Sequence, residues 1–145
     1  MSHPHRRQLA RRLSAKLGNV PVVSNGDREK STPNALETSI EAWKLQEYNS
    51  THHMVVQDDI RLSSSYVERV SRAISIFPDA VTAFYANWDS AEGAAVRLAV
   101  SAGCSWVTAL NIDYFPTLAV VMPSARADDF VKYSSAAPAG HLQDR

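Results

Sequence analysis

Five segments of the chain repeat apolar residues at the spacing of an amphipathic helix. The predicted helices cover residues 4–17, 32–48, 65–77, 91–102 and 124–133. In the first of them Gly18 is placed to end the helix, and the leucines on one face are Leu9, Leu13 and Leu17. The third is predicted to begin with a capping box of Ser65 and Glu68, and its expected inward face is Val67, Val70 and Ile74.

Short apolar runs separate these helices and predict strands at residues 19–23, 53–57, 80–85, 105–110 and 117–122. Because helices and strands alternate, the pattern predicts an α/β fold, a three-layer sandwich with a mostly parallel sheet and the strand 53–57 at its centre. The close spacing of the last two strands leaves an antiparallel edge open as an alternative. One domain is predicted over residues 1–133, followed by a flexible tail, 134–145, which is rich in small residues.

The composition constrains the partners and the location. The 145 residues include 15 Lys and Arg against 15 Asp and Glu, so no overall charge draws the protein to nucleic acid or to an anionic membrane. A single cysteine, Cys104, excludes an internal disulfide. Neither a signal segment nor a membrane span is indicated, which predicts a cytoplasmic protein. An open sheet edge would allow a homo-oligomer.

The most informative motif follows the strand 53–57. The apolar run from Met54 to Val56 ends in Gln57 and two adjacent carboxylates, Asp58 and Asp59. Oxygen ligands at the end of a strand suit Mg²⁺ or Mn²⁺, which hold the phosphates of nucleotides. Acidic residues also commonly open a solvated loop, so the pair alone favours the metal site and the ordinary loop about equally.

Several stretches together resemble the GT-A type glycosyltransferases, which transfer sugars from nucleoside diphosphates. The resemblance lies in His3-Pro4-His5-Arg6, in Val20-Pro21-Val22-Val23, in Ala42-Trp43 and in the run from Thr51 to Ile60, where Gln57-Asp58-Asp59 matches the acidic DxD-type motif. It covers most of the chain loosely. The chain resembles a shortened member, because little sequence precedes His3-Pro4 and the chain ends at Arg145.

The resemblance implies roles for individual residues. Asp59 would hold Mn²⁺ or Mg²⁺, with Asp58 close by directly or through water, and the ion would stabilise the leaving diphosphate. Arg6 or Arg7 would lie near the nucleotide of the nucleotide-sugar donor, and Asp144 would be the base that activates an unknown acceptor. Trp88, in a polar loop after a predicted strand, is the tryptophan expected to contact the ligand.

Two other functional classes stay open. One is a non-catalytic binding or assembly domain of the same fold. The other is a phosphoacceptor domain, which is disfavoured because it needs a late lysine at a strand tip, whereas the only lysine after Asp59 is Lys132, in a predicted helix. A metal site at His52 and His53 is also disfavoured, because neighbouring residues of a strand point to opposite faces.

Overall fold

The computed structural model describes residues 6–24, 35–109 and 115–136. In these residues the chain forms five helices and three strands. In chain order the elements are α1 (Arg7–Lys16), α2 (Ala35–Trp43), β1 (His52–Val56), α3 (Tyr66–Ile76), β2 (Thr82–Ala83), α4 (Ala91–Ser101), β3 (Ala119–Pro123) and α5 (Ser124–Ala136).

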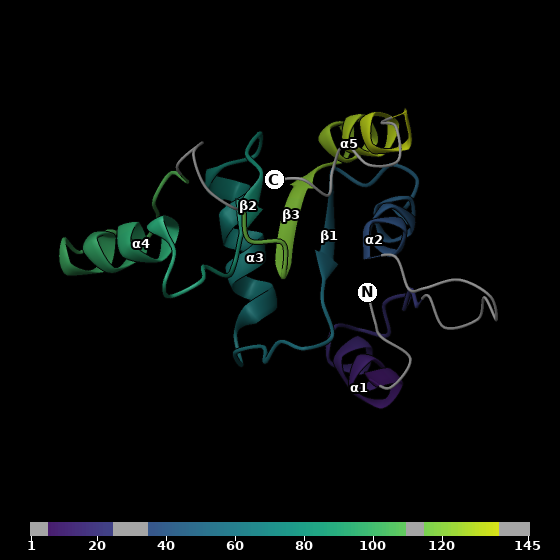
Figure 1. Ribbon diagram of the computed structural model, residues 1–145, viewed down its shortest axis with the longest axis horizontal. Helices are drawn as coiled ribbons and strands as arrows, with labels where there is room; N and C mark the ends of the chain where they lie inside the picture. The colour runs from purple at the N-terminus through teal and green to yellow at the C-terminus, as the bar shows by residue number, and fades with distance from the viewer. Residues whose placement is uncertain (1–5, 25–34, 110–114, 137–145) are drawn as a thin grey trace.

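The strands form an antiparallel sheet in the order β1-β3-β2 (Figure 1). His52 pairs with Pro123 at one end of the β1 and β3 ladder, and Val56 pairs with Ala119 at the other. The expected mostly parallel sandwich of the GT-A kind is therefore wrong, and so is the central position of the strand 53–57. β3 takes the centre because residues 119–122 are all buried, whereas β1 begins with two histidines that need polar partners.

Alternate residues of the two longer strands divide the core between the faces of the sheet. On one face Val55, Val120 and Met122 pack with Trp43 of α2 and Ala127 of α5. On the other face Ala119 and Val121 pack with Tyr66 and Val70 of α3. Figure 1 shows α3 on one side of the sheet and the pair α2 and α5 on the other. Each face of β3 is thus shielded from water.

Three of the five predicted strands differ from expectation. Residues 20–23 form no strand, and only an isolated bridge occurs at Ser24. The run 80–85 is reduced to the two residues of β2. Residues 105–109 are exposed and do not form a strand, and Leu110 lies outside the described residues. An apolar run becomes a strand only where a neighbouring strand can accept its hydrogen bonds; the run 80–85 meets β3 over a short stretch only, and the described parts of the other two runs form no ladder.

The helices follow the predicted pattern more closely. α1 ends as expected, with Gly18 at φ 89° and Asn19 at φ 64°, a left-handed pair that reverses the chain. In α3 the expected inward face is partly wrong, because Val67 is 56% exposed and the buried residues are Tyr66, Val70 and Ala73. The expected capping box is not formed either: the Ser65 side chain makes no cap, and its Oγ accepts from Arg69 Nε at 3.2 Å.

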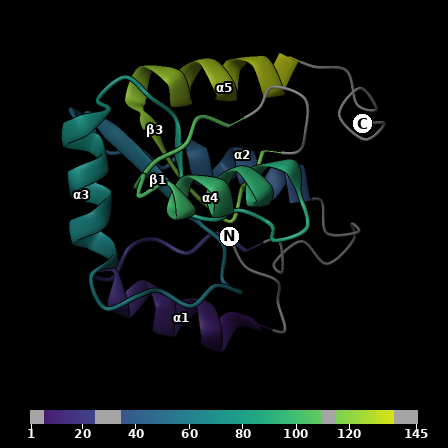
Figure 2. The same ribbon diagram turned by 90° about the vertical axis from the view of Figure 1, so that its left-hand side faces the viewer.

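The last two helices lie at the periphery. α4 stands outside the layered body on the side of α3 and β2, as the two perpendicular views agree (Figures 1 and 2). α5 continues to Ala136 with Ser134 buried, so the predicted start of the tail at residue 134 falls inside this helix, and residues 137–145 lie outside the described part. In the described residues no helix has the length and apolar character needed to cross a membrane.

Candidate functional site

The acidic pair lies just past the end of β1. Gln57 N still donates to Leu118 O at 2.8 Å, which continues the ladder by one residue before the chain turns at Asp58 and Asp59. Arg6, the residue before α1, reaches both carboxylates, with 3.3 Å from its Nη1 to Asp58 Oδ1 and 2.9 Å to Asp59 Oδ2. The structure therefore brings together three residues that the sequence singled out.

The two carboxylates differ in exposure. The side chain of Asp58 is 4% exposed, whereas those of Asp59 and Arg6 are 43% and 40% exposed. The hydrogen bond that Arg6 donates to Asp59 raises the pKa of the Arg6 guanidinium above its ordinary value; burial opposes this, and the charges of both carboxylates add to the rise. Arg6 is therefore a permanent cation at the junction of α1 and β1.

In this structure a cation, the Arg6 guanidinium, already occupies the acidic pair. Mg²⁺ and Mn²⁺ need several oxygen ligands, and here one guanidinium already occupies an oxygen of each carboxylate. Across residues 6–24, 35–109 and 115–136 no three His, Cys, Asp or Glu side chains gather in a group that could hold a metal. With Arg6 in this position the pair acts as an anionic anchor for the start of α1.

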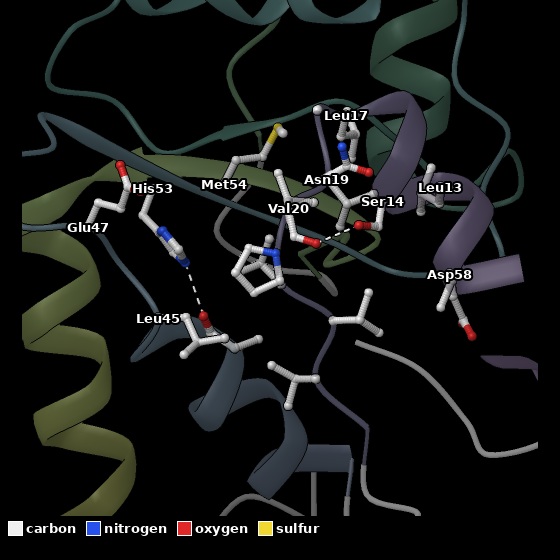
Figure 3. A pocket seen from close by; sticks show the side chains of 18 of the residues that line it. Leu13, Ser14, Leu17, Asn19, Val20, Leu45, Glu47, His53, Met54 and Asp58 are labelled. Atoms are coloured by element: carbon white, nitrogen blue, oxygen red, sulfur yellow. Dashed lines mark hydrogen bonds between the residues drawn. The ribbon is translucent and has the colours of Figure 1, made fainter. Parts of the chain in front are cut away.

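A hollow of about 460 Å³ lies beside this anchor, between α1, the segment 17–23 and β1 (Figure 3). Consecutive residues of β1 line it, and so does Asp58. Within the described residues β1 pairs with β3 alone and forms an edge of the sheet, and the hollow lies along this strand. The other residues of its wall are mainly apolar, among them Leu13, Leu17, Val20, Val22 and Leu45.

The turn after α1 builds one wall of this hollow. Ser14 Oγ donates to Val20 O, and Asn19 N donates to Ser14 O at 2.8 Å. These bonds hold the reversed chain against the helix, so that residues 20–23 run past β1 without pairing with it. This wall was not predicted, because the apolar run 19–23 favours a strand, although Gly18-Asn19 was a signal for a left-handed reversal.

His53, on β1, is one of the polar residues in the opposite wall of the hollow. Its Nε2 lies 3.0 Å from Ala42 O, and because a carbonyl only accepts, Nε2 carries the proton. The ring also meets Trp43 edge to face at 5.4 Å between centroids. His52 Nε2 lies 2.8 Å from Pro78 O, so the two rings bond to carbonyls of different segments.

The remaining predicted site residues are elsewhere. Trp88 is 69% exposed in the loop before α4, where Arg97 lies 4.5 Å from its ring centroid, and it does not line the hollow. Arg7, the first residue of α1, is exposed, and Arg6 contacts both carboxylates. Asp144 lies outside the described residues. Of the predicted set, Arg6, Asp58 and Asp59 form a cluster.

Comparisons with protein-family models, with curated proteins and with solved structures give no match for this chain. The function must therefore be argued from the site itself.

Proposed function

We propose that the protein is a non-catalytic binding domain whose ligand occupies the hollow between α1, the segment 17–23 and β1. The observation that carries this proposal is the combination of a volume of about 460 Å³ with a mostly apolar wall and a few polar side chains. Sites for small ligands typically have this size and this character. The Arg6 anchor supports the proposal, since it holds α1 and β1 together at one end of the hollow.

The polar groups of the wall favour a ligand that donates hydrogen bonds. Glu47 and Asp58 both line the hollow, and their carboxylates are hydrogen-bond acceptors. The apolar side chains favour a hydrocarbon body. A medium-length alkylamine combines both features, whereas an alkyl carboxylate of equal length carries the wrong charge for Glu47 and Asp58.

The experiment is a comparison of these two ligand classes below their micelle concentrations, read by thermal shift and by amide chemical shifts. Alkylamines should stabilise the protein, by about 2.7 kcal/mol at one hundred times the dissociation constant, and should shift the amides of β1. Alkyl carboxylates should have a much smaller effect. If neither class shifts the β1 amides, the binding proposal is wrong.

A matched pair of variants locates the ligand. Val22 lines the hollow and Val81 does not, yet the two are 43% and 42% exposed. Val22→Trp should fill the hollow and weaken alkylamine binding at least tenfold, whereas Val81→Trp should leave it unchanged. Equal binding by both variants would place the ligand at another site.

Sugar transfer from a nucleoside diphosphate is the second candidate, and the observation that favours it is the acidic pair beside the hollow. A divalent ion would have to displace Arg6 from both carboxylates. The test is a thermal shift with nucleoside diphosphates in the presence of Mn²⁺, compared with Asp59→Asn. This candidate requires a metal-dependent shift in the unmodified protein that the variant loses; no shift at millimolar concentrations rejects it.

A further inference from the structure

The outward face of α1 concentrates positive charge on a protein whose overall charge is zero. Four of the ten residues of this helix are cationic and none is acidic. The cations are Arg7, Arg11, Arg12 and Lys16, and all four are exposed. Because the chain is neutral as a whole, this charge is a local feature that the composition conceals.

The cations form two rows along the helix. At about 100° per residue, Arg7 and Arg11 lie roughly 40° apart on one flank, and Arg12 and Lys16 lie roughly 40° apart on the other. The two rows are separated by about 100° or more around the axis. Between them lie Gln8 and Ala15, which are also exposed. The outward face therefore has a narrow, uncharged centre with a basic row on each side.

Most of the apolar side of α1 is already used, although Leu9 is 49% exposed. Ala10 is 5% exposed, Leu13 lines the hollow, and Leu17 packs against the cluster that contains Tyr66 and Val70. Both views show α1 at the outside of the molecule, with no other described element beyond it (Figures 1 and 2). A partner would thus meet the basic face, on a helix whose start is held by Arg6.

We propose that the outward face of α1 binds duplex DNA by lying in the major groove. That groove is about 12 Å wide and accepts one α-helix, so each basic row would face the phosphates of one strand. Guanidinium groups suit this role because they bind phosphate oxygens in a bidentate manner. Gln8, between the rows, would face the base edges. A lipid surface fits less well, because an interfacial helix must insert an apolar side, and among Leu9, Leu13 and Leu17 only Leu9 is exposed.

Binding of the full-length protein to a labelled duplex of about 20 base pairs, followed by anisotropy between 50 and 200 mM salt, tests this proposal. Four phosphate contacts predict a slope of about 3.6 in log K against log salt, which is a loss of about 150-fold in affinity over that range. Arg12→Gln/Lys16→Gln, which removes one row, should reduce the slope to about 1.8 and the loss to about 12-fold.

The control removes the same charge from another exposed helix face. Arg69→Gln/Arg72→Gln on α3 should retain the full slope. The proposal is overturned if no duplex is bound at 50 mM salt, or if both double variants change the slope equally. Tighter binding to a single strand of equal length would overturn the groove geometry. Tighter binding to phosphatidylserine vesicles at equal phosphate concentration would identify a membrane partner instead. Unchanged circular dichroism of both variants excludes misfolding as the cause.

Discussion

Replacing Arg6 by Gln should loosen the attachment of α1 to the end of β1 without disturbing the core. Arg6 contributes to the stability of the fold through two ion pairs, whose carboxylates differ in exposure. Its contact with Asp59 joins two side chains that are 40% and 43% exposed, so it contributes about 0.2–1 kcal/mol. Its contact with Asp58 involves a carboxylate that is 4% exposed, which makes the loss of the partner more costly.

The size of the second contribution follows from the exposure of both partners. Removing one member of a fully buried pair costs about 3–5 kcal/mol. Arg6 is itself 40% exposed, and Asp58 has a further interaction, so water and that partner compensate in part. We therefore expect about 1–2 kcal/mol for the contact with Asp58, and about 1–3 kcal/mol of lost stability for Arg6→Gln in total.

Urea denaturation with double-mutant cycles measures these terms separately. The coupling of Arg6 to Asp58, from Arg6→Gln and Asp58→Asn, should exceed the coupling to Asp59, from Arg6→Gln and Asp59→Asn. High salt should weaken the Asp59 coupling more, since exposed pairs are screened and buried ones are not. Arg11→Gln is the matched control, because it removes an exposed cation from the same helix.

Two results would refute this reasoning. A coupling to Asp58 indistinguishable from zero would mean that its burial does not depend on Arg6. A loss of stability in Arg11→Gln as large as that in Arg6→Gln would assign the effect to the general charge of α1. The cycle also bears on the metal hypothesis: if Mn²⁺ stabilises Arg6→Gln but not the unmodified protein, the acidic pair is capable of binding the ion and Arg6 is what excludes it.

Three further predictions concern the core and α4. Burial raises the pKa of the Tyr66 hydroxyl to about 12, whereas a tyrosine of the unfolded chain ionises near pH 10. The stability that depends on the neutral ring is therefore complete below pH 10 and is lost between about pH 10 and 12, by roughly 2.7 kcal/mol. Tyr66→Phe should remove this part of the alkaline denaturation curve. Gly93→Ala should lower the stability of the protein by more than about 2 kcal/mol in thermal unfolding. The reason is that a Cβ at this position would meet Asn87 O and lie 2.7 Å from Trp88 O, in the turn before α4. A neutral effect would mean that this turn shifts freely. Among the described residues neither carboxylate oxygen of the buried Glu92 has a hydrogen-bond partner. Glu92→Gln should therefore raise the free energy of unfolding by about 1 kcal/mol, seen as a higher urea midpoint, and a lower midpoint would reveal a cationic partner.

The helices of this protein were largely predictable from its sequence, because their signals are local. The spacing of Leu9, Leu13 and Leu17 and the glycine that follows place α1, and Ser90 caps α4 by accepting from Gly93 N. Errors of one residue in the inward face, as at Val67, arise because periodicity shows that a stripe exists but not what packs against it. The apolar runs that became β1 and β3 were equally visible.

Strand direction and strand order were decided only by the tertiary structure. Alternation of helices and strands favoured parallel pairing, yet β3 returns between β1 and β2 in the antiparallel sense. Neither the direction nor the central position is encoded within a strand; both depend on which neighbours bury it. β3 is at the centre because its residues can be covered on both faces, whereas the histidines of β1 find carbonyl partners at an edge.

The candidate site, too, was predictable from the sequence only in part. Asp58 and Asp59 stand out in the sequence because they end an apolar run, and their position after β1 follows from that local pattern. That Arg6, more than fifty residues earlier, occupies both carboxylates could not be deduced, since the ion pairs depend on how α1 docks. The hollow is likewise a product of packing: its walls come from a helix, a reversed segment and a strand edge that no sequence spacing relates to one another.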